Sequence, residues 1–170
     1  MRGKSYIASK WFEVEENMIV AFLGPRRLKI TKEVETRLID TIAKLVVNDG
    51  AYVFLFTNEG RFDYACWEIV TSLQVLYPNI RRIYARKEDK DDVKYLQGIC
   101  YEDAFLLDAV RDAGILAESV RDDAMIGMCD ILVTYFDTEN LRMPRIKSDV
   151  ETAVDCARKY NKRVINIWKK

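Results

Sequence analysis

The chain has 170 residues, of which 49% are hydrophobic, and 27 lysines and arginines balance 27 aspartates and glutamates. This length and composition predict one folded domain rather than a disordered chain. The balanced charge argues against non-specific nucleic-acid binding, which needs a cationic surface, but it allows a small anion to be held by a few arginines.

The residue types exclude several kinds of chemistry. The chain has no histidine, which rules out histidine acid–base catalysis and Ser-His-Asp triads. Its four cysteines include no C-x-x-C pair, which argues against a zinc site. Residues 1–17 lack the apolar core of a signal peptide, and no apolar run approaches the roughly 18 residues of a membrane span. The sequence therefore predicts a cytoplasmic protein with free thiols, without a metal and without a membrane partner.

The chain divides into an N-terminal arm, residues 1–17, and a domain, residues 18–170. Continuous apolar runs predict buried strands, and apolar residues at helical spacing predict helices between them. In chain order, the predicted elements are a strand at 18–24, a helix at 31–50, a strand at 51–57, a helix from 62 to just before Pro78, a strand at 80–86, a polar irregular insertion at 87–100, helices at about 101–113 and 118–129, a strand at 130–136, a helix from Ser148 and a strand at 163–168.

Strands that alternate with helices predict one α/β domain, a doubly wound Rossmann-like fold with a mainly parallel sheet. Ligands of such folds bind beyond the carboxyl ends of the strands. Three loops leave those ends, at 24–30, 57–62 and 137–148. We expect the three loops to converge on one site.

The first loop contains Gly24, Pro25 and Arg26. A glycine at a strand end lets the backbone approach a ligand, and an arginine offers a planar fork to phosphate or carboxylate. The alternative is a tight turn with a solvated arginine. Both interpretations fit the sequence of this loop.

The second loop contains Asn58, Glu59 and Gly60 and leads to Asp63 in the first turn of a helix. The amides that open this helix could cradle an anion, whereas Asp63 could simply favour the helix dipole. Glu59 counts against a phosphate because it would repel one at close range. Neither G-x-G-x-x-G nor a P-loop lysine is present, so no standard dinucleotide or NTPase fingerprint is found.

Two later segments carry further candidates. Arg121 lies on the helix before the fourth long strand, where its spacing is typical of a solvated helix arginine; the alternative is a ligand contact. Ser148 is a predicted N-cap, with Glu151 three residues on in a capping box. In the functional alternative, Asp149 or Glu151 points into the cleft as a general acid or base.

Five stretches of the sequence, in this order, resemble the SLOG superfamily of Rossmann-like nucleotide-binding proteins, which includes the LOG phosphoribohydrolases and the DprA DNA-processing proteins. Within it, the chain is most similar to the bacterial YpsA-like group. The stretches are AFLGPRR, FLFTNEGRFDYACWEIVTSLQVLYPNIRRIYAR, YEDAFLLDAVRDAG, VRDDAMIGMCDILVTYFDTENLRMPR and KSDVETAVDCARKYNKRVINI.

The resemblance implies a nucleotide-like ligand at the strand ends. The matching positions in the first two loops are Gly24, Arg26, Gly60 and Asp63. Arg121 matches an arginine that LOG-type enzymes place near the ribosyl phosphate. The resemblance also allows a homodimer.

A second match concerns catalysis and the loop that precedes the last helix. Asp149 or Glu151 corresponds to the LOG glutamate that assists cleavage of the N-glycosidic bond. The sequence departs from the family here, because Asp149 and Val150 replace the glycine and threonine of a serine-glycine-threonine loop. Asp149 adds a negative charge and Val150 lacks a hydroxyl, so both changes weaken a phosphate cradle.

The sequence therefore predicts a binding domain, a sensor or adaptor, for a nucleotide or a nucleotide derivative. The predicted ligand contacts are Gly24, Arg26, Asn58, Gly60, Asp63 and Ser148, with no required cofactor. The first alternative is a LOG-type N-glycosidase or phosphoribohydrolase with Arg121, Asp149 and Glu151 as catalytic residues. The second is a degenerate pocket in a domain that serves protein interaction.

Overall fold

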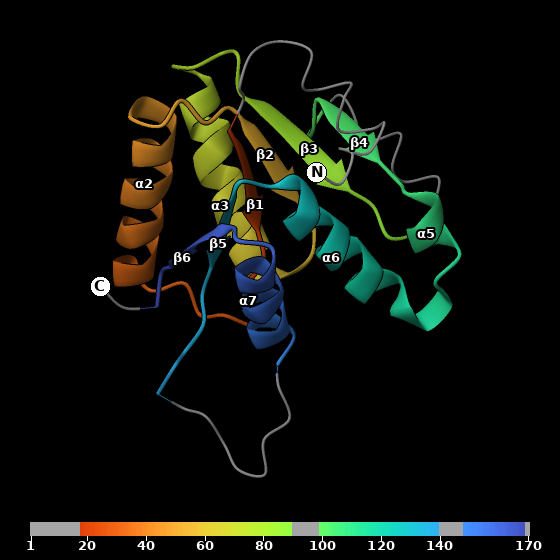
Figure 1. The fold of residues 1–170 in the computed structure, drawn as a ribbon. Coiled ribbons are helices and arrows are strands. Elements are labelled where there is room, and N and C mark those ends of the chain that lie inside the picture. The colour runs from red at the N-terminus through yellow and green to blue at the C-terminus, as the bar shows by residue number, and fades with distance from the viewer. Residues whose placement is uncertain (1–17, 90–98, 140–147, 169–170) are drawn as a thin grey trace.

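The computed structural model describes residues 18–89, 99–139 and 148–168 (Figure 1). The predicted N-terminal arm and most of the predicted insertion at 87–100 lie outside these residues. The helices are α2 (Lys32–Val47), α3 (Gly60–Gln74), α5 (Asp108–Arg111), α6 (Ala117–Met128) and α7 (Asp149–Lys159), with a 3-10 turn, η1, at Gly114–Leu116. The strands are β1 (Ile19–Phe22), β2 (Val53–Phe56), β3 (Arg81–Ala85), β4 (Asp103–Phe105), β5 (Ile131–Thr134) and β6 (Arg163–Asn166).

The six strands form one sheet in the order β4-β3-β2-β1-β5-β6, and every neighbouring pair is parallel. The prediction of a Rossmann-like α/β fold is therefore confirmed. From β1 the chain builds the sheet outward through β2 and β3 to β4, and it then returns to the other side of β1 to form β5 and β6. The order reverses between β1 and β5, which makes this the topological switch point of the sheet.

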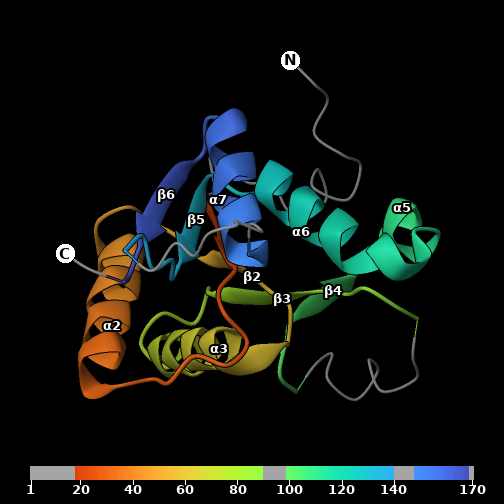
Figure 2. The same cartoon turned by 90° about the horizontal axis from the view of Figure 1, so that it is seen from below.

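The sheet is covered on both faces, and this explains the continuous apolar strands. Helices α2 and α3 cover one face, while α6 and α7 cover the other (Figure 2). Val20 and Phe22 of β1 pack into the cluster beside α2 and α3, and Ile19 and Ala21 pack into the opposite cluster. All four side chains are almost completely buried, so β1 is a central strand with two apolar faces.

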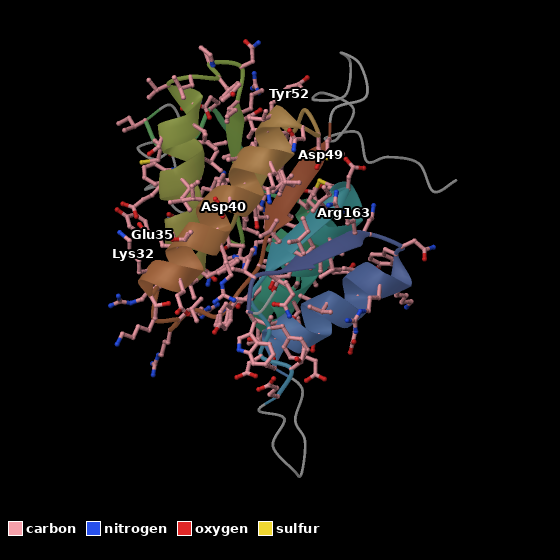
Figure 3. The ribbon with its side chains drawn as sticks, turned by 90° about the vertical axis from the view of Figure 1, so that its left-hand side faces the viewer. Lys32, Glu35, Asp40, Asp49, Tyr52 and Arg163 are labelled. Atoms are coloured by element: carbon pink, nitrogen blue, oxygen red, sulfur yellow. The ribbon has the colours of Figure 1, made fainter. Side chains whose placement is uncertain are left out.

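Local signals fix the two ends of α2 as the sequence predicts. Thr31 accepts a hydrogen bond from the Val34 amide at 3.3 Å and so caps α2. Beyond the other end of α2, Gly50 has a φ of +67°, a conformation that favours glycine. Asp49 then pairs with Arg163 of β6 at 3.5 Å, and both residues are labelled in Figure 3.

The predicted helix at 101–113 is wrong over its first part, where the chain instead adds β4 to the sheet. Asp103 and Phe105 lie opposite Ile83 and Ala85 of β3, so the ladder at the open edge of β3 decides the conformation. The neighbouring Glu102 strengthens this edge, because its carboxylate accepts a hydrogen bond from the Arg82 amide at 2.7 Å. Only the four residues of α5 remain helical in this segment.

In the part of the chain that the structure describes, no helix has both the length and the apolar character that crossing a bilayer requires.

Candidate functional site

A cleft of about 780 Å³ lies beyond the carboxyl ends of β1 and β5, at the switch point of the sheet. Its walls come from the first two predicted loops, from the two ends of the third, and from the first two turns of α6 and α7; residues 140–147 of the third predicted loop lie outside the described residues. The lining residues are Phe22, Leu23, Gly24, Pro25, Arg26, Arg27, Thr57, Glu59, Asp63, Glu118, Arg121, Asp122, Tyr135, Phe136, Asp137, Ser148, Asp149, Val150, Glu151 and Ala153. The convergence of distant segments on one site is the expected consequence of the topology.

Most of the predicted site residues line this cleft, and two do not. Those that line it are Gly24, Arg26, Asp63, Arg121, Ser148, Asp149 and Glu151. Asn58 and Gly60 are absent from its walls. Asn58 takes a left-handed conformation, with φ at +57°, and its side-chain oxygen accepts a hydrogen bond from the Tyr101 hydroxyl at 3.2 Å.

Gly60 joins the second loop tightly to the first. It has a φ of +83°, and a Cβ atom at this position would lie 2.5 Å from the Cα atom of Arg26. The next amide, that of Arg61, donates a hydrogen bond to the Arg26 carbonyl oxygen at 2.9 Å. This amide at the start of α3 therefore already has a hydrogen-bond partner within the protein and is not free for a ligand.

Gly24 has a similar packing role at the start of the first loop. A Cβ atom on Gly24 would lie 2.3 Å from the ring of Phe62, which is fully buried. The missing side chain lets the Phe62 ring pack against the backbone beneath the cleft. The glycine thus brings α3 close to the end of β1.

Asp63 holds the second loop in place from the floor of the cleft. Its Oδ1 accepts hydrogen bonds from the amide of Thr57 at 2.8 Å and from the Thr57 hydroxyl at 3.1 Å, and its Oδ2 accepts one from the Asn58 amide at 3.1 Å. Burial raises the pKa of Asp63 to about 7, although these hydrogen bonds favour the charged form. The N-cap of α3 is Glu59, whose side chain makes no capping bond.

Arg121 is buried, so its interpretation as a solvated helix arginine is wrong. The residue is 2% exposed and lines the cleft. Its Nε and Nη2 donate to Asp122 Oδ1 at 3.0 and 2.9 Å, and its Nη2 lies 3.5 Å from Glu59 Oε2. Burial opposes the charge of Arg121, but the carboxylates of Asp122 and Glu59 outweigh it and raise its pKa. Among the described residues, its buried Nη1 has no hydrogen-bond partner.

Glu59 is the centre of an ion-pair network at the mouth of the cleft. Its Oε2 lies 2.8 Å from Nη2 of Arg26 and also faces Arg121, while its Oε1 pairs with Lys87. Burial favours the neutral form, but Lys87, Arg121 and Arg26 together lower the pKa of Glu59. Arg26 pairs with Glu118 as well. Each of these cations therefore already has a carboxylate partner.

The start of α7 forms the far wall of the cleft. Ser148 Oγ accepts a hydrogen bond from the Glu151 amide at 3.1 Å, so the predicted N-cap is confirmed. Asp149 is exposed in the first turn of α7, and Glu151 is 6% exposed. Both carboxylates thus line the cleft from a helix whose cap is already formed.

The residues that the sequence reasoning missed include Glu118, Tyr135 and Phe136. Glu118 precedes Arg121 by three residues, a spacing that puts both on one face of α6. Tyr135 and Phe136 directly follow β5, which is the place where a parallel strand delivers residues to a ligand. Helical spacing and strand-end position were thus the available signals.

Metal binding finds no support in this arrangement. Within residues 18–89, 99–139 and 148–168, no three or more histidine, cysteine, aspartate or glutamate side chains are grouped so that they could hold a metal ion. The four cysteines are free thiols, and Cys66 and Cys129 are buried.

No family model and no curated protein sequence matches this chain. Among solved structures, the chain is similar to DNA processing protein A (DprA) from Streptococcus pneumoniae, with a TM-score of 0.58 and 12% sequence identity. The similarity covers 87% of this chain and 49% of the DprA chain, so this chain spans about half the length of that protein. The fold is therefore a DprA-type Rossmann-like fold, as the resemblance to the SLOG superfamily implies. The likeness to the YpsA-like group stays a prediction.

Proposed function

We propose that this chain is a binding domain, a sensor or adaptor, whose cleft takes a nucleotide or a nucleotide-derived small molecule. The observation that carries the proposal is the state of Arg121. Its guanidinium is buried in the cleft wall, and its Nη1 lacks a partner in the described part of the chain. A buried donor without a partner costs about 1–3 kcal/mol, so a ligand acceptor that reaches Nη1 removes this cost.

The size and position of the cleft support the proposal. Small-molecule sites commonly have volumes of about 300–1,000 Å³, and the cleft has about 780 Å³. It lies at the topological switch point, the usual ligand position in open α/β sheets. Tyr135 and Phe136 add aromatic surface, which suits a planar base.

The proposal is tested by a thermal-shift screen of the purified chain. The panel contains nucleobases, nucleosides, nucleoside mono-, di- and triphosphates, ADP-ribose, NAD and cyclic dinucleotides. A ligand at a hundredfold excess over its Kd stabilises the folded state by about 2.7 kcal/mol, which is a shift of roughly 5–10 °C for a chain of this size. A panel without any hit would contradict the proposal.

The variant Arg121→Lys tests whether a ligand found in the screen binds in the cleft. It keeps the positive charge beside Asp122 and Glu59 but loses the guanidinium fork. We expect Arg121→Lys to bind this ligand at least tenfold more weakly than the wild type does. The matched control is Arg111→Lys on α5, whose side chain is half-exposed and lies outside the cleft. Equal binding by both variants would move the ligand to another site.

A LOG-type N-glycosidase is the second candidate, and the buried Glu151 favours it. Glu151 lines the same cleft as Arg121, where a carboxylate could act on a leaving base or on water. Release of free base from a nucleoside or nucleotide, lost in Glu151→Gln but kept in Glu35→Gln, would support this activity. Glu35 lies on the exposed side of α2 (Figure 3).

A further inference from the structure

We infer that the cleft selects a nucleoside or nucleobase without a phosphate group, and that Glu59 is the residue that excludes phosphate. The inference rests on the proposed function and narrows its ligand class. It also marks a disagreement with the resemblance, which implies a ribosyl phosphate beside Arg121. The residues that line this cleft do not fit such a group, for three reasons.

The first reason is the charge of the cleft walls. Among the lining residues that the structure describes, three arginines face seven carboxyl groups, which is a formal excess of four negative charges when all are ionised. Burial raises the pKa of Asp63 to about 7 and also raises the pKa of Asp122, so the excess near neutral pH is smaller. This described part of the cleft wall disfavours a phosphate, whereas it tolerates a neutral or cationic ligand.

The second reason is that Glu59 already occupies the position an anion would need. Its two carboxylate oxygens face Arg26, Arg121 and Lys87, and the Arg26 contact is 2.8 Å long. A phosphate that bound these cations would have to displace Glu59 or stand beside it. Because the paired cations hold Glu59 in its charged form, both routes are unfavourable.

The third reason is that the helix starts at the cleft are partly used by the protein itself and carry a competing carboxylate. The Arg61 amide at the start of α3 donates to the Arg26 carbonyl oxygen at 2.9 Å. At the start of α7, Ser148 accepts the Glu151 amide at 3.1 Å, and the carboxylate of Asp149 stands in the first turn. Phosphate binding at a helix N-terminus needs free amides and no competing negative charge.

What remains in the cleft suits a nucleoside. Arg121 lines the cleft, and a small shift of its buried guanidinium on binding would let Nη1, which lacks a partner among the described residues, donate to one neutral acceptor, such as a base carbonyl or ring nitrogen. Tyr135 and Phe136 provide aromatic surface for a planar ring. The exposed carboxylate of Asp149, which lines the cleft, is an acceptor of the kind that sugar hydroxyls and exocyclic amino groups need.

The test compares the wild-type chain with Glu59→Gln, using the common ribonucleosides, their 5′-monophosphates and inorganic pyrophosphate in calorimetric titrations. For the wild type we expect a nucleoside to bind at least tenfold more tightly than its monophosphate, and pyrophosphate not to bind. Glu59→Gln should reduce the nucleoside preference at least tenfold and should gain pyrophosphate binding. The matched control is Asp40→Asn, which removes one charge from the exposed side of α2, away from the cleft (Figure 3).

Each outcome decides either the ligand class or the proposed function. Wild-type binding of a monophosphate or pyrophosphate as tight as that of the nucleoside overturns the inference, and so does a Glu59→Gln variant that gains no affinity for pyrophosphate. If no nucleoside binds but pyrophosphate binds only to Glu59→Gln, Glu59 excludes phosphate while the proposed function fails. If Glu59→Gln does not fold, Glu59→Ala replaces it, and the wild-type comparison alone still decides the preference.

Discussion

The substitution Gly60→Ala tests whether the second loop is pinned against the first. The residue has a φ of +83°, and a non-glycine residue in this region costs about 1–2 kcal/mol. The added Cβ would also lie 2.5 Å from the Cα atom of Arg26, so the backbone of the first loop must move. Overpacking of this kind typically costs about 1–3 kcal/mol. We therefore expect Gly60→Ala to lower the free energy of unfolding by roughly 2–5 kcal/mol.

Gly50→Ala separates the two contributions. Gly50 has a φ of +67°, but nothing lies within 4 Å of a Cβ atom there. Only the backbone cost applies, so the expected loss is about 1–2 kcal/mol. Urea unfolding of both variants and the wild type, with linear extrapolation, measures the difference. If Gly60→Ala costs no more than Gly50→Ala, the loops are not held together by this contact and the shape of the cleft is not fixed by it.

Three further predictions concern single residues. Burial raises the pKa of Asp63 from 3.8 to about 7, so the folded chain keeps a proton that the unfolded chain releases. The stability that this proton gives is complete below about pH 4 and is lost as the pH rises through 7. Between pH 4 and pH 7, the unfolding free energy of the wild type relative to that of Asp63→Asn should therefore fall by up to about 1.4 kcal/mol per pH unit. A difference that does not change with pH would contradict the raised pKa of Asp63. Thr31→Ala removes the cap of α2 and should cost about 1 kcal/mol in urea unfolding, whereas Thr36→Ala within the same helix should cost less than half of that. Gly127→Ala in α6 meets open space and should raise the unfolding free energy by about 0.5–1 kcal/mol; a loss would show that the position is constrained.

The fold was predictable because its signals are local. The runs that contain β1, β2 and β5 are apolar on both faces, and α2 and α7 begin at the residues their caps indicate. The exception is β4, three residues long, whose strand conformation depends on pairing with the edge of β3. A strand this short carries too few residues for a periodic pattern, and the helical residues that follow it in α5 dominate the sequence signal.

The site was predictable in its position but not in its electrostatics. Parallel strands alone bring the three loops to one edge of the sheet. The burial of Arg121, however, depends on Glu59, which lies 62 positions earlier in the chain. Arg26 is likewise paired with Glu118, and no local sequence pattern predicts this ion pair. Long-range ion pairs of this kind appear only when the helices are packed.

The most direct test of the account is a titration of the wild-type chain and Arg121→Lys with the common ribonucleosides. The account predicts that at least one nucleoside binds the wild type and that Arg121→Lys weakens this binding at least tenfold, because the guanidinium that lines the cleft is lost. Equal affinity of both proteins for a bound nucleoside, or no binding of any nucleoside to the wild type, would contradict it.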